Sequence, residues 1–434
     1  MLLVFTKTVT PRLRYIFDFF IKDLMGFEYQ ITHNKEEFKS FAGARLSYGT
    51  EAIDNEIFIY SEKLLFEKGI EDQQLSVFEW DGVKAMFATH PKYTIPFDVF
   101  AASFYLVSRY EEYLPHLRDS HDRFVETESI AWQKNFLQKP IVNIWAAKLR
   151  MIILGRFPGI KFLQQPYRYI STVDIDNAYA YREKGIMRTV GSYAKNVTEL
   201  NFAQIAERTR VLMRMEQDPY DTYEFMHELH AKFKVHVIYF FLLGEYGEND
   251  KNLPTDNKNF QELIKSLADY GEAGIHPSYA SNKKAGRLSK EIVLLSKILK
   301  REVTKSRQHF LKLRMPNTYR HLIDADISDD YTMGYAGQVG FRAGTCSTFY
   351  FYDLDLEQET NLKVHPFACM DATFKYYMKT DVDKVMDIVK SLVDEVRAVN
   401  GTFISLWHNE SLSESYIWKG YKNIYRELVE YAHH

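Results

Sequence analysis

Cysteine and long apolar runs are both scarce in this 434-residue sequence. It has two cysteines, Cys346 and Cys369, too few for a disulfide framework or a cysteine-based zinc site. No run of about 18 apolar residues occurs, so we expect no transmembrane helix. The opening "MLLVF" lacks the basic segment and the small-residue cleavage site of a secretory signal. We therefore expect a cytoplasmic protein.

An excess of one charge is also missing. Fifty-five Lys and Arg residues face 58 Asp and Glu residues, giving a net charge of −3. Nucleic-acid binding normally needs a basic face, so no nucleic-acid partner is predicted. Aromatic residues make up 15% of the chain. They suit a large core and also a groove that stacks on sugars, and a core is the commoner use.

Residues 1–155 are predicted to form a smaller mixed α/β domain. Segment 10–24 has helical periodicity with Pro11 near its start, and segment 55–61 alternates like a strand. Segment 95–124 begins as an apolar helix and ends in a dense polar cluster between Arg109 and Arg123. Such a cluster is explained by a solvated helix end or by a surface that docks on a second domain.

Residues 160–434 alternate between strand and helix patterns at least six times. "KVHVIYFFLLG" (234–244) is nearly all apolar, as a strand buried on both faces would be. Other strands are expected at "PYRYISTVDID", "EAGIHP", "RQHFLKLR" and "GTFISLWHN". The alternation predicts an α/β fold, a deformed (β/α) barrel of seven or eight units.

Ionisable residues fall where these strands are expected to end. Asp174 and Asp176 share one face of a strand, where two carboxylates repel unless they share a cation or a proton. A surface pair that caps the next helix is the plainer explanation. His276 and His408 end two strands and His309 lies in a third; any one of them alone would suit a structural histidine. Strand ends converge in a barrel, so the set predicts a metal site.

The ordered motifs "STVDIDNA", "GIHPSY", "LRMP" and "SLWHN" resemble those of the polysaccharide deacetylase family, the NodB-homology group of carbohydrate esterase family 4. The chain looks like a divergent branch that carries an N-terminal domain of unknown function. The resemblance implies that Asp174 is the catalytic base, Asp176 a metal ligand and His408 the general acid. It also implies that Arg314 orients Asp174. Arg342, in "GFRAGT", is the alternative for that role.

The sequence departs from the family in the second motif. The family carries another histidine four residues after the first, but here Ala280 follows His276 at that spacing. His309 would supply the missing nitrogen if its strand ended just after it. Ser278 or water would otherwise complete the shell, or no metal would bind. Asp371, in "CMDA", would be an outer carboxylate or a helix cap.

The resemblance implies a metal-dependent hydrolase that removes an acetyl group from an N-acetylated sugar of a glycan or glycan precursor. Asp176, His276 and His309 would hold the metal. Zn²⁺ is expected, with Fe²⁺, Co²⁺, Ni²⁺ and Mn²⁺ as alternatives, because the ligands are oxygen and imidazole. Two other functions stay open: a catalytically altered barrel that binds glycan or acts as a scaffold, and an Asp-x-Asp glycosyltransferase.

Overall fold

The computed structural model describes residues 1–283 and 285–434, and its largest sheet has nine strands. Their order in space is β12-β13-β11-β10-β9-β8-β7-β15-β14, and all neighbours are parallel except β12 and β13. The strands are β7 (Arg168–Ile175), β8 (His236–Leu242), β9 (Glu272–His276), β10 (Lys305–Ser306), β11 (Asp329–Asp330), β12 (Phe349–Asp353), β13 (Gln358–Val364), β14 (Cys369–Met370) and β15 (Thr402–His408).

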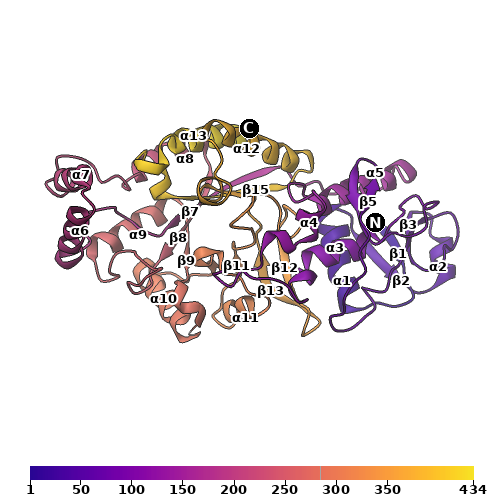
Figure 1. The fold of residues 1–434 in the computed structure, drawn as a ribbon. Coiled ribbons are helices and arrows are strands. Elements are labelled where there is room, and N and C mark those ends of the chain that lie inside the picture. The colour runs from indigo at the N-terminus through magenta and orange to yellow at the C-terminus, as the bar shows by residue number, and fades with distance from the viewer. Residues whose placement is uncertain (284) are drawn as a thin grey trace.

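Helices follow most of these strands and lie outside the sheet (Figure 1). They are α6 (Ile186–Thr198), α7 (Phe202–Leu212), α8 (Tyr223–Phe233), α9 (Lys258–Tyr270), α10 (Ala285–Leu299), α11 (Asn317–Ile323), α12 (Val382–Ala398) and α13 (Tyr421–His433). The α/β prediction is confirmed. The hydrogen-bonded order runs from β12 to β14, and among the described residues no strand pairing joins these two ends.

The strand expected over "RQHFLKLR" (307–314) is wrong, because strand β10 ends at Ser306, before this segment begins. Strand β10 has two residues, and a 3₁₀ turn, η5 (His309–Leu311), follows it. Phe310 and Leu311 have φ values of 60° and 52°, so the chain turns sharply just after His309. His309 therefore lies after the end of β10 and begins a turn that precedes Arg314.

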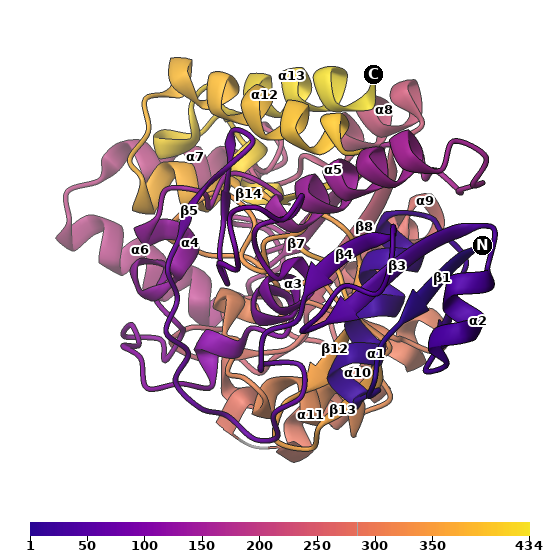
Figure 2. The same cartoon turned by 90° about the vertical axis from the view of Figure 1, so that its right-hand side faces the viewer.

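The N-terminal region contains a four-stranded parallel sheet in the order β2-β1-β3-β4 (Figure 2). Its strands are β1 (Leu2–Phe5), β2 (Tyr29–Thr32), β3 (Ala44–Gly49) and β4 (Ile57–Tyr60), and β5 (Phe78–Trp80) pairs with β6 (Val83–Ala85). The helices are α1 (Pro11–Phe17), the π-helix η1 (Asp18–Leu24), α2 (Lys35–Ser40), α3 (Val99–Val107), α4 (Ile130–Gln133) and α5 (Ile141–Arg156).

The first helix begins where the sequence predicts. The hydroxyl of Thr10 accepts a hydrogen bond from the backbone N–H of Leu13, and Pro11 occupies the first helical position, where its missing N–H costs nothing. Asp98 caps α3 in the same way, accepting from the N–H groups of Phe100 and Ala101.

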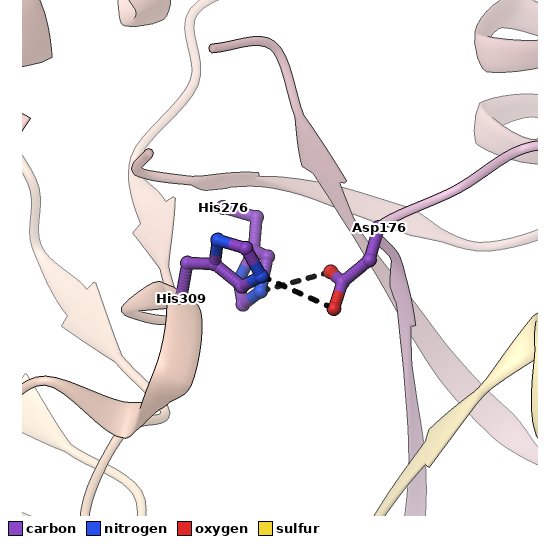
Figure 3. Close-up of side chains that lie close together, drawn as sticks. All are labelled: Asp176, His276 and His309. Carbon is purple, nitrogen blue, oxygen red and sulfur yellow. Dashed lines mark ion pairs between the residues drawn. The ribbon is translucent and has the colours of Figure 1, made fainter. Parts of the chain in front are cut away.

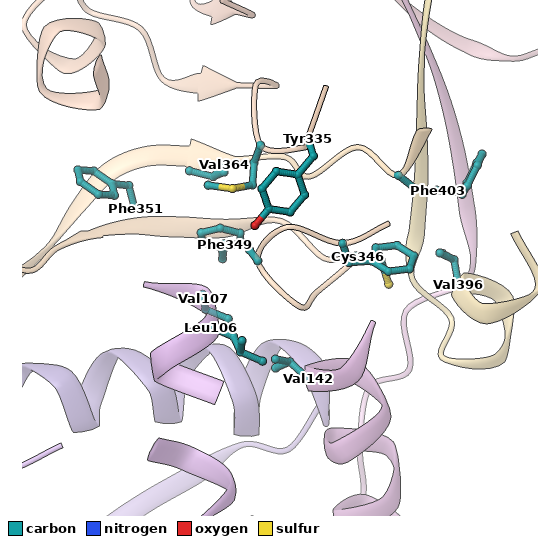
Figure 4. Close-up of a cluster of buried hydrophobic side chains, with 14 of the residues drawn as sticks. Leu106, Val107, Val142, Tyr335, Cys346, Phe349, Phe351, Val364, Val396 and Phe403 are labelled. Carbon is teal, nitrogen blue, oxygen red and sulfur yellow. The ribbon is translucent and has the colours of Figure 1, made fainter. Parts of the chain in front are cut away.

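The N-terminal region packs on β12 and β13 through a buried apolar layer (Figure 4). Leu106 and Val107 of α3 and Val142 of α5 lie on the side of β12 to which Phe349 points, and the Phe349 ring also contacts Phe19 of η1. One hydrophobic cluster extends through both regions of the chain. The division into domains 1–155 and 160–434 therefore stays a prediction, because the largest cluster of buried apolar residues spans both regions.

A buried ionic network crosses the same boundary. The carboxylate of Glu112 accepts hydrogen bonds from Arg342 Nη2 at 2.7 Å and Nε at 2.9 Å, and from Arg109 Nε at 2.7 Å. The docking interpretation is right for Arg109 and Glu112. The proposed role of Arg342 is wrong, because Glu112 and the Gly334 carbonyl bind its guanidinium away from Asp174.

Among the described residues, no helix combines the length and the apolar character needed to cross a bilayer.

Candidate metal centre and active site

Three side chains, Asp176, His276 and His309, come together at the carboxyl ends of strands β7, β9 and β10 (Figure 3). Asp176 directly follows β7, His276 ends β9, and His309 begins the turn after β10. His276 Nε2 lies 3.1 Å from Asp176 Oδ1, and His309 Nε2 lies 3.4 Å from Asp176 Oδ2. One ligand atom from each residue lies within 4.8 Å of the other two.

The outer nitrogens of both histidines are fixed by acceptors. His276 Nδ1 lies 2.6 Å from the carbonyl oxygen of Arg307, and His309 Nδ1 lies 2.9 Å from Asp250 Oδ1. A carbonyl or carboxylate oxygen can only accept here, so each Nδ1 carries the proton. In the neutral rings, Nε2 then directs a lone pair toward Asp176. Metal-binding histidines are commonly held in this way, with the outer ring nitrogen donating to a carbonyl or carboxylate oxygen.

These three inward atoms are all acceptors when the imidazoles are neutral, so they need a cation between them. Oδ1 of Asp176 is buried and has no hydrogen-bond donor among the described residues. Tetrahedral ligand atoms about 2.1 Å from Zn²⁺ lie about 3.4 Å apart, close to the two distances measured here. The residues present therefore fit a divalent cation.

In the metal-free protein, a proton on His309 can supply the positive charge that these acceptor atoms need. Burial lowers the pKa of His309, but the carboxylates of Asp176 and Asp250 outweigh it and raise that pKa to about 9. For Asp176 the directions are the opposite. Burial raises the pKa of its carboxyl group, but His309 and His276 outweigh this and hold that pKa well below its usual range. These shifts show that the cluster stabilises a positive charge, whether from a proton or from a cation.

Asp174 has a different environment from Asp176. It is buried, and its Oδ1 accepts a hydrogen bond from Arg307 Nη1 at 3.1 Å. Arg307 is held in turn by Thr172 Oγ1 at 2.6 Å and by the carbonyl oxygen of Tyr331 at 3.0 Å. Asp174 Oδ2 lies 3.7 Å from His276 Nε2, so the carboxylate borders the metal centre. Arg307 therefore orients Asp174.

The proposed role of Arg314 is wrong. Its side chain is 54% exposed and its Nη1 lies 3.6 Å from Asp122, in the N-terminal region. The turn at Phe310 and Leu311 carries Arg314 away from Asp174.

His408 completes the opposite side of the centre. Its Nδ1 lies 2.8 Å from Asp371 Oδ1, and its backbone N–H donates to Asp371 Oδ2 at 2.8 Å. Its Nε2 lies 3.6 Å from Asp176 Oδ2. Burial lowers the pKa of His408, but Asp371 and Asp176 outweigh this and raise it well above its usual value. The imidazolium is thus placed as a proton donor, and Asp371 is its orienting carboxylate.

A cavity of about 190 Å³ opens over these groups. Aromatic side chains supply much of its wall: Phe310, Tyr376, Tyr377 and Trp418. Glu410 also lines it, and burial raises the pKa of Glu410 to about 7. Arg123, from the N-terminal region, contributes to the same wall. Asp250, Arg307 and Glu410 were not expected from the sequence. Arg123 belongs to the predicted polar cluster, but its place in this wall was not expected.

Comparisons with known proteins gave one matching family model and several similar solved structures. A family of unknown function, DUF7033, matches residues 2–158. A search of curated proteins gave no match. A protein assigned as a polysaccharide deacetylase from Mycobacterium smegmatis is 12% identical, with 63% of this chain and 86% of that chain covered and a TM-score of 0.39.

Two further solved structures show likeness of the same order. A polysaccharide deacetylase from Bacillus cereus is 12% identical, with 60% of this chain and 89% of that chain covered and a TM-score of 0.28. A CE4 family pseudoenzyme from Bacillus anthracis is 10% identical, with 61% of each chain covered and a TM-score of 0.30. At such low identity, the chemistry must be inferred from the site residues themselves.

Proposed function

We propose that this protein is a metal-dependent hydrolase that removes an acetyl group from an N-acetylated sugar of a glycan or glycan precursor. One observation carries the proposal. Asp176, His276 and His309 form a cluster suited to a divalent cation. The carboxylate of Asp174, which Arg307 binds, borders this cluster, and so does His408, whose pKa is raised. Metal-assisted hydrolysis of an amide uses a cation that polarises the carbonyl, a base for the attacking water and an acid for the leaving amine, and this site offers a candidate for each.

Bound Zn²⁺ would polarise the acetamide carbonyl and lower the pKa of the attacking water. Asp174, oriented by Arg307, accepts the proton of that water as it attacks. His408 donates its Nε2 proton to the amine nitrogen as the C–N bond breaks. This donation is necessary because an unprotonated amide nitrogen is a very poor leaving group. Asp371 holds His408 in the required orientation.

Neither alternative function gains support from the geometry. A glycosyltransferase would use both carboxylates of Asp-x-Asp on one metal–nucleotide complex, but Arg307 binds Asp174 here. The altered barrel rested on Ala280, which cannot bind a metal. His309 lies near Asp176 in its place, so the lack of a second-motif histidine does not leave the cluster short of nitrogen.

The test is acetate release by the zinc-reconstituted protein from N-acetylglucosamine oligomers and from lipid-linked and nucleotide-linked N-acetyl sugars. We expect zinc-dependent release that Asp174→Asn and His408→Ala abolish. The matched control is His236→Ala, which removes an exposed histidine paired with Glu272. Metal binding without acetate release from any of these substrates would reject the proposal and favour an altered barrel. The cytoplasmic location stays a prediction.

A further inference from the structure

A second cavity, of about 170 Å³, lies beside the first. The two cavities share Arg123, Leu311 and Tyr377 as lining residues. One wall of the second cavity comes from segment 119–126 of the N-terminal region, and the facing wall from loop 334–337, which follows β11. The N-terminal region therefore borders the candidate active site on the side of this second cavity.

Arg123 fixes the boundary between the two cavities. Its Nε donates to Asp119 Oδ2 at 2.7 Å, and its Nη1 donates to the carbonyl oxygen of Phe310 at 2.8 Å. Its Nη2 donates to the hydroxyl of Tyr377 at 3.2 Å, with the guanidinium carbon 5.7 Å from the centre of that ring. Tyr377 is 43% exposed, so a held aromatic ring is available to a ligand that reaches both cavities.

The polar groups of the second cavity suit a neutral ligand. Arg123 pairs with Asp119 and Arg342 pairs with Glu112, so these charges are already compensated. The carboxylate of Glu126 has no hydrogen bond or ion pair among the described residues, and it lies over Gly337. A Cβ added at Gly337 would come within 2.1 Å of Glu126 Oε1. The cavity thus offers a free acceptor for hydroxyl groups and no uncompensated cation for a phosphate.

Neither cavity alone reaches the volume of about 300 Å³ at the lower limit of small-molecule sites, but the two together exceed it. We propose that they form one site for a carbohydrate of at least two sugar units. The N-acetylated unit occupies the first cavity, and the next unit lies beyond Tyr377, with its hydroxyl groups toward Glu126. This inference rests on the proposed function, and it gives the N-terminal region a part in choosing the substrate.

The experiment measures binding of N-acetylglucosamine and its β-1,4-linked dimer to the zinc-loaded, full-length Asp174→Asn variant, which prevents turnover. We expect the dimer to bind at least ~10-fold more tightly than the monomer, a difference of about 1.4 kcal/mol. Adding Glu126→Ala or Gly337→Val should remove most of that gain. Glu128→Ala, two residues along the same 3₁₀ turn, η3 (Glu126–Glu128), is the matched control and should keep it.

The outcomes separate this inference from the proposed function. If the Asp174→Asn variant binds the dimer no more tightly than the monomer, while the unsubstituted protein deacetylates the monomer, the second subsite alone is rejected. An equal gain in the Glu126→Ala, Gly337→Val and Glu128→Ala proteins would place the second sugar elsewhere. If neither sugar binds the zinc-loaded protein, both proposals fail. An unchanged melting temperature in either test variant shows that its effect is local.

Discussion

Asp250 connects His309 to the position where the second-motif histidine is missing. Its Oδ1 accepts from His309 Nδ1 at 2.9 Å and from the backbone N–H of Tyr279 at 2.9 Å, while its Oδ2 accepts from the N–H of Ala280 at 3.3 Å. One carboxylate therefore contacts both the His309 imidazole and the backbone at Tyr279 and Ala280. Each of its contacts favours a single position of His309 beside Asp176.

The first prediction concerns this orienting carboxylate. Asp250→Ala should weaken Zn²⁺ binding by about 10–100-fold, the usual effect of losing a partner behind a ligating histidine. Competition with a chelating dye measures the affinity. Asp256→Ala, an exposed residue in the same loop, is the control. Equal affinities in the two variants would show that Asp250 does not position His309.

The second prediction concerns the Arg307–Asp174 pair, both of whose side chains are buried. Arg307→Ala should lower the free energy of unfolding by about 3–5 kcal/mol, because it leaves a buried carboxylate without its cation. Urea unfolding measures this change. The double variant Arg307→Ala/Asp174→Asn should recover part of the loss, and purely additive effects would contradict a direct pair.

The third prediction concerns the pH dependence of catalysis. His408 must be protonated to act as an acid, so kcat/KM falls as the pH rises through its pKa. Burial lowers that pKa, and the carboxylate of Asp371 raises it above its usual value. Asp371→Asn removes this charge, so the alkaline loss of activity should move to lower pH. A pH profile of kcat/KM checks it, and an unmoved alkaline limb would contradict the assignment.

The fourth prediction concerns the ionic network between the two regions. Burial raises the pKa of Glu112, but Arg342 and Arg109 outweigh it and lower that pKa to about 2. Because the folded pKa is depressed, this stabilisation is present above the unfolded value of about 4.3 and is lost as the pH falls toward 2.

Glu112→Gln should therefore lower the free energy of unfolding at neutral pH by about 3–5 kcal/mol, because it leaves the buried Arg342 without a carboxylate and Arg109 with Glu111 alone. The variant should also lose less stability than the native protein between pH 4 and pH 2, near the ordinary and lowered pKa values of Glu112. Denaturant unfolding across this range tests both effects. Glu36→Gln, at an 84% exposed side chain, is the control. A change equal to that of the control would show that the network adds nothing.

The ends of long strands could be predicted from the sequence. β7, β9 and β15 each end in or just before an ionisable residue, and a run of apolar residues that stops at Asp or His marks that end. Because parallel strand ends meet at one edge of a sheet, Asp176, His276 and His408 could be grouped without a structure.

The arginine that holds Asp174 could not be chosen in this way. Arg314 and Arg342 each follow a motif-like pattern, but the turn at Phe310 and the network around Glu112 direct them elsewhere. Arg307 lies beyond a two-residue strand that periodicity cannot detect. The part of the N-terminal region in the cavity wall depends on contacts such as Arg123 to the Phe310 carbonyl, which join residues 187 positions apart.

The most direct test of the account is the metal content of the protein after zinc reconstitution, measured by elemental analysis. The native chain and the His236→Ala control should hold about one equivalent of zinc, as a single mononuclear site would. His276→Ala and His309→Ala should each lose it. Full retention in His309→Ala would contradict the replacement of the second-motif histidine. An absence of metal from the native chain would contradict the metal centre itself.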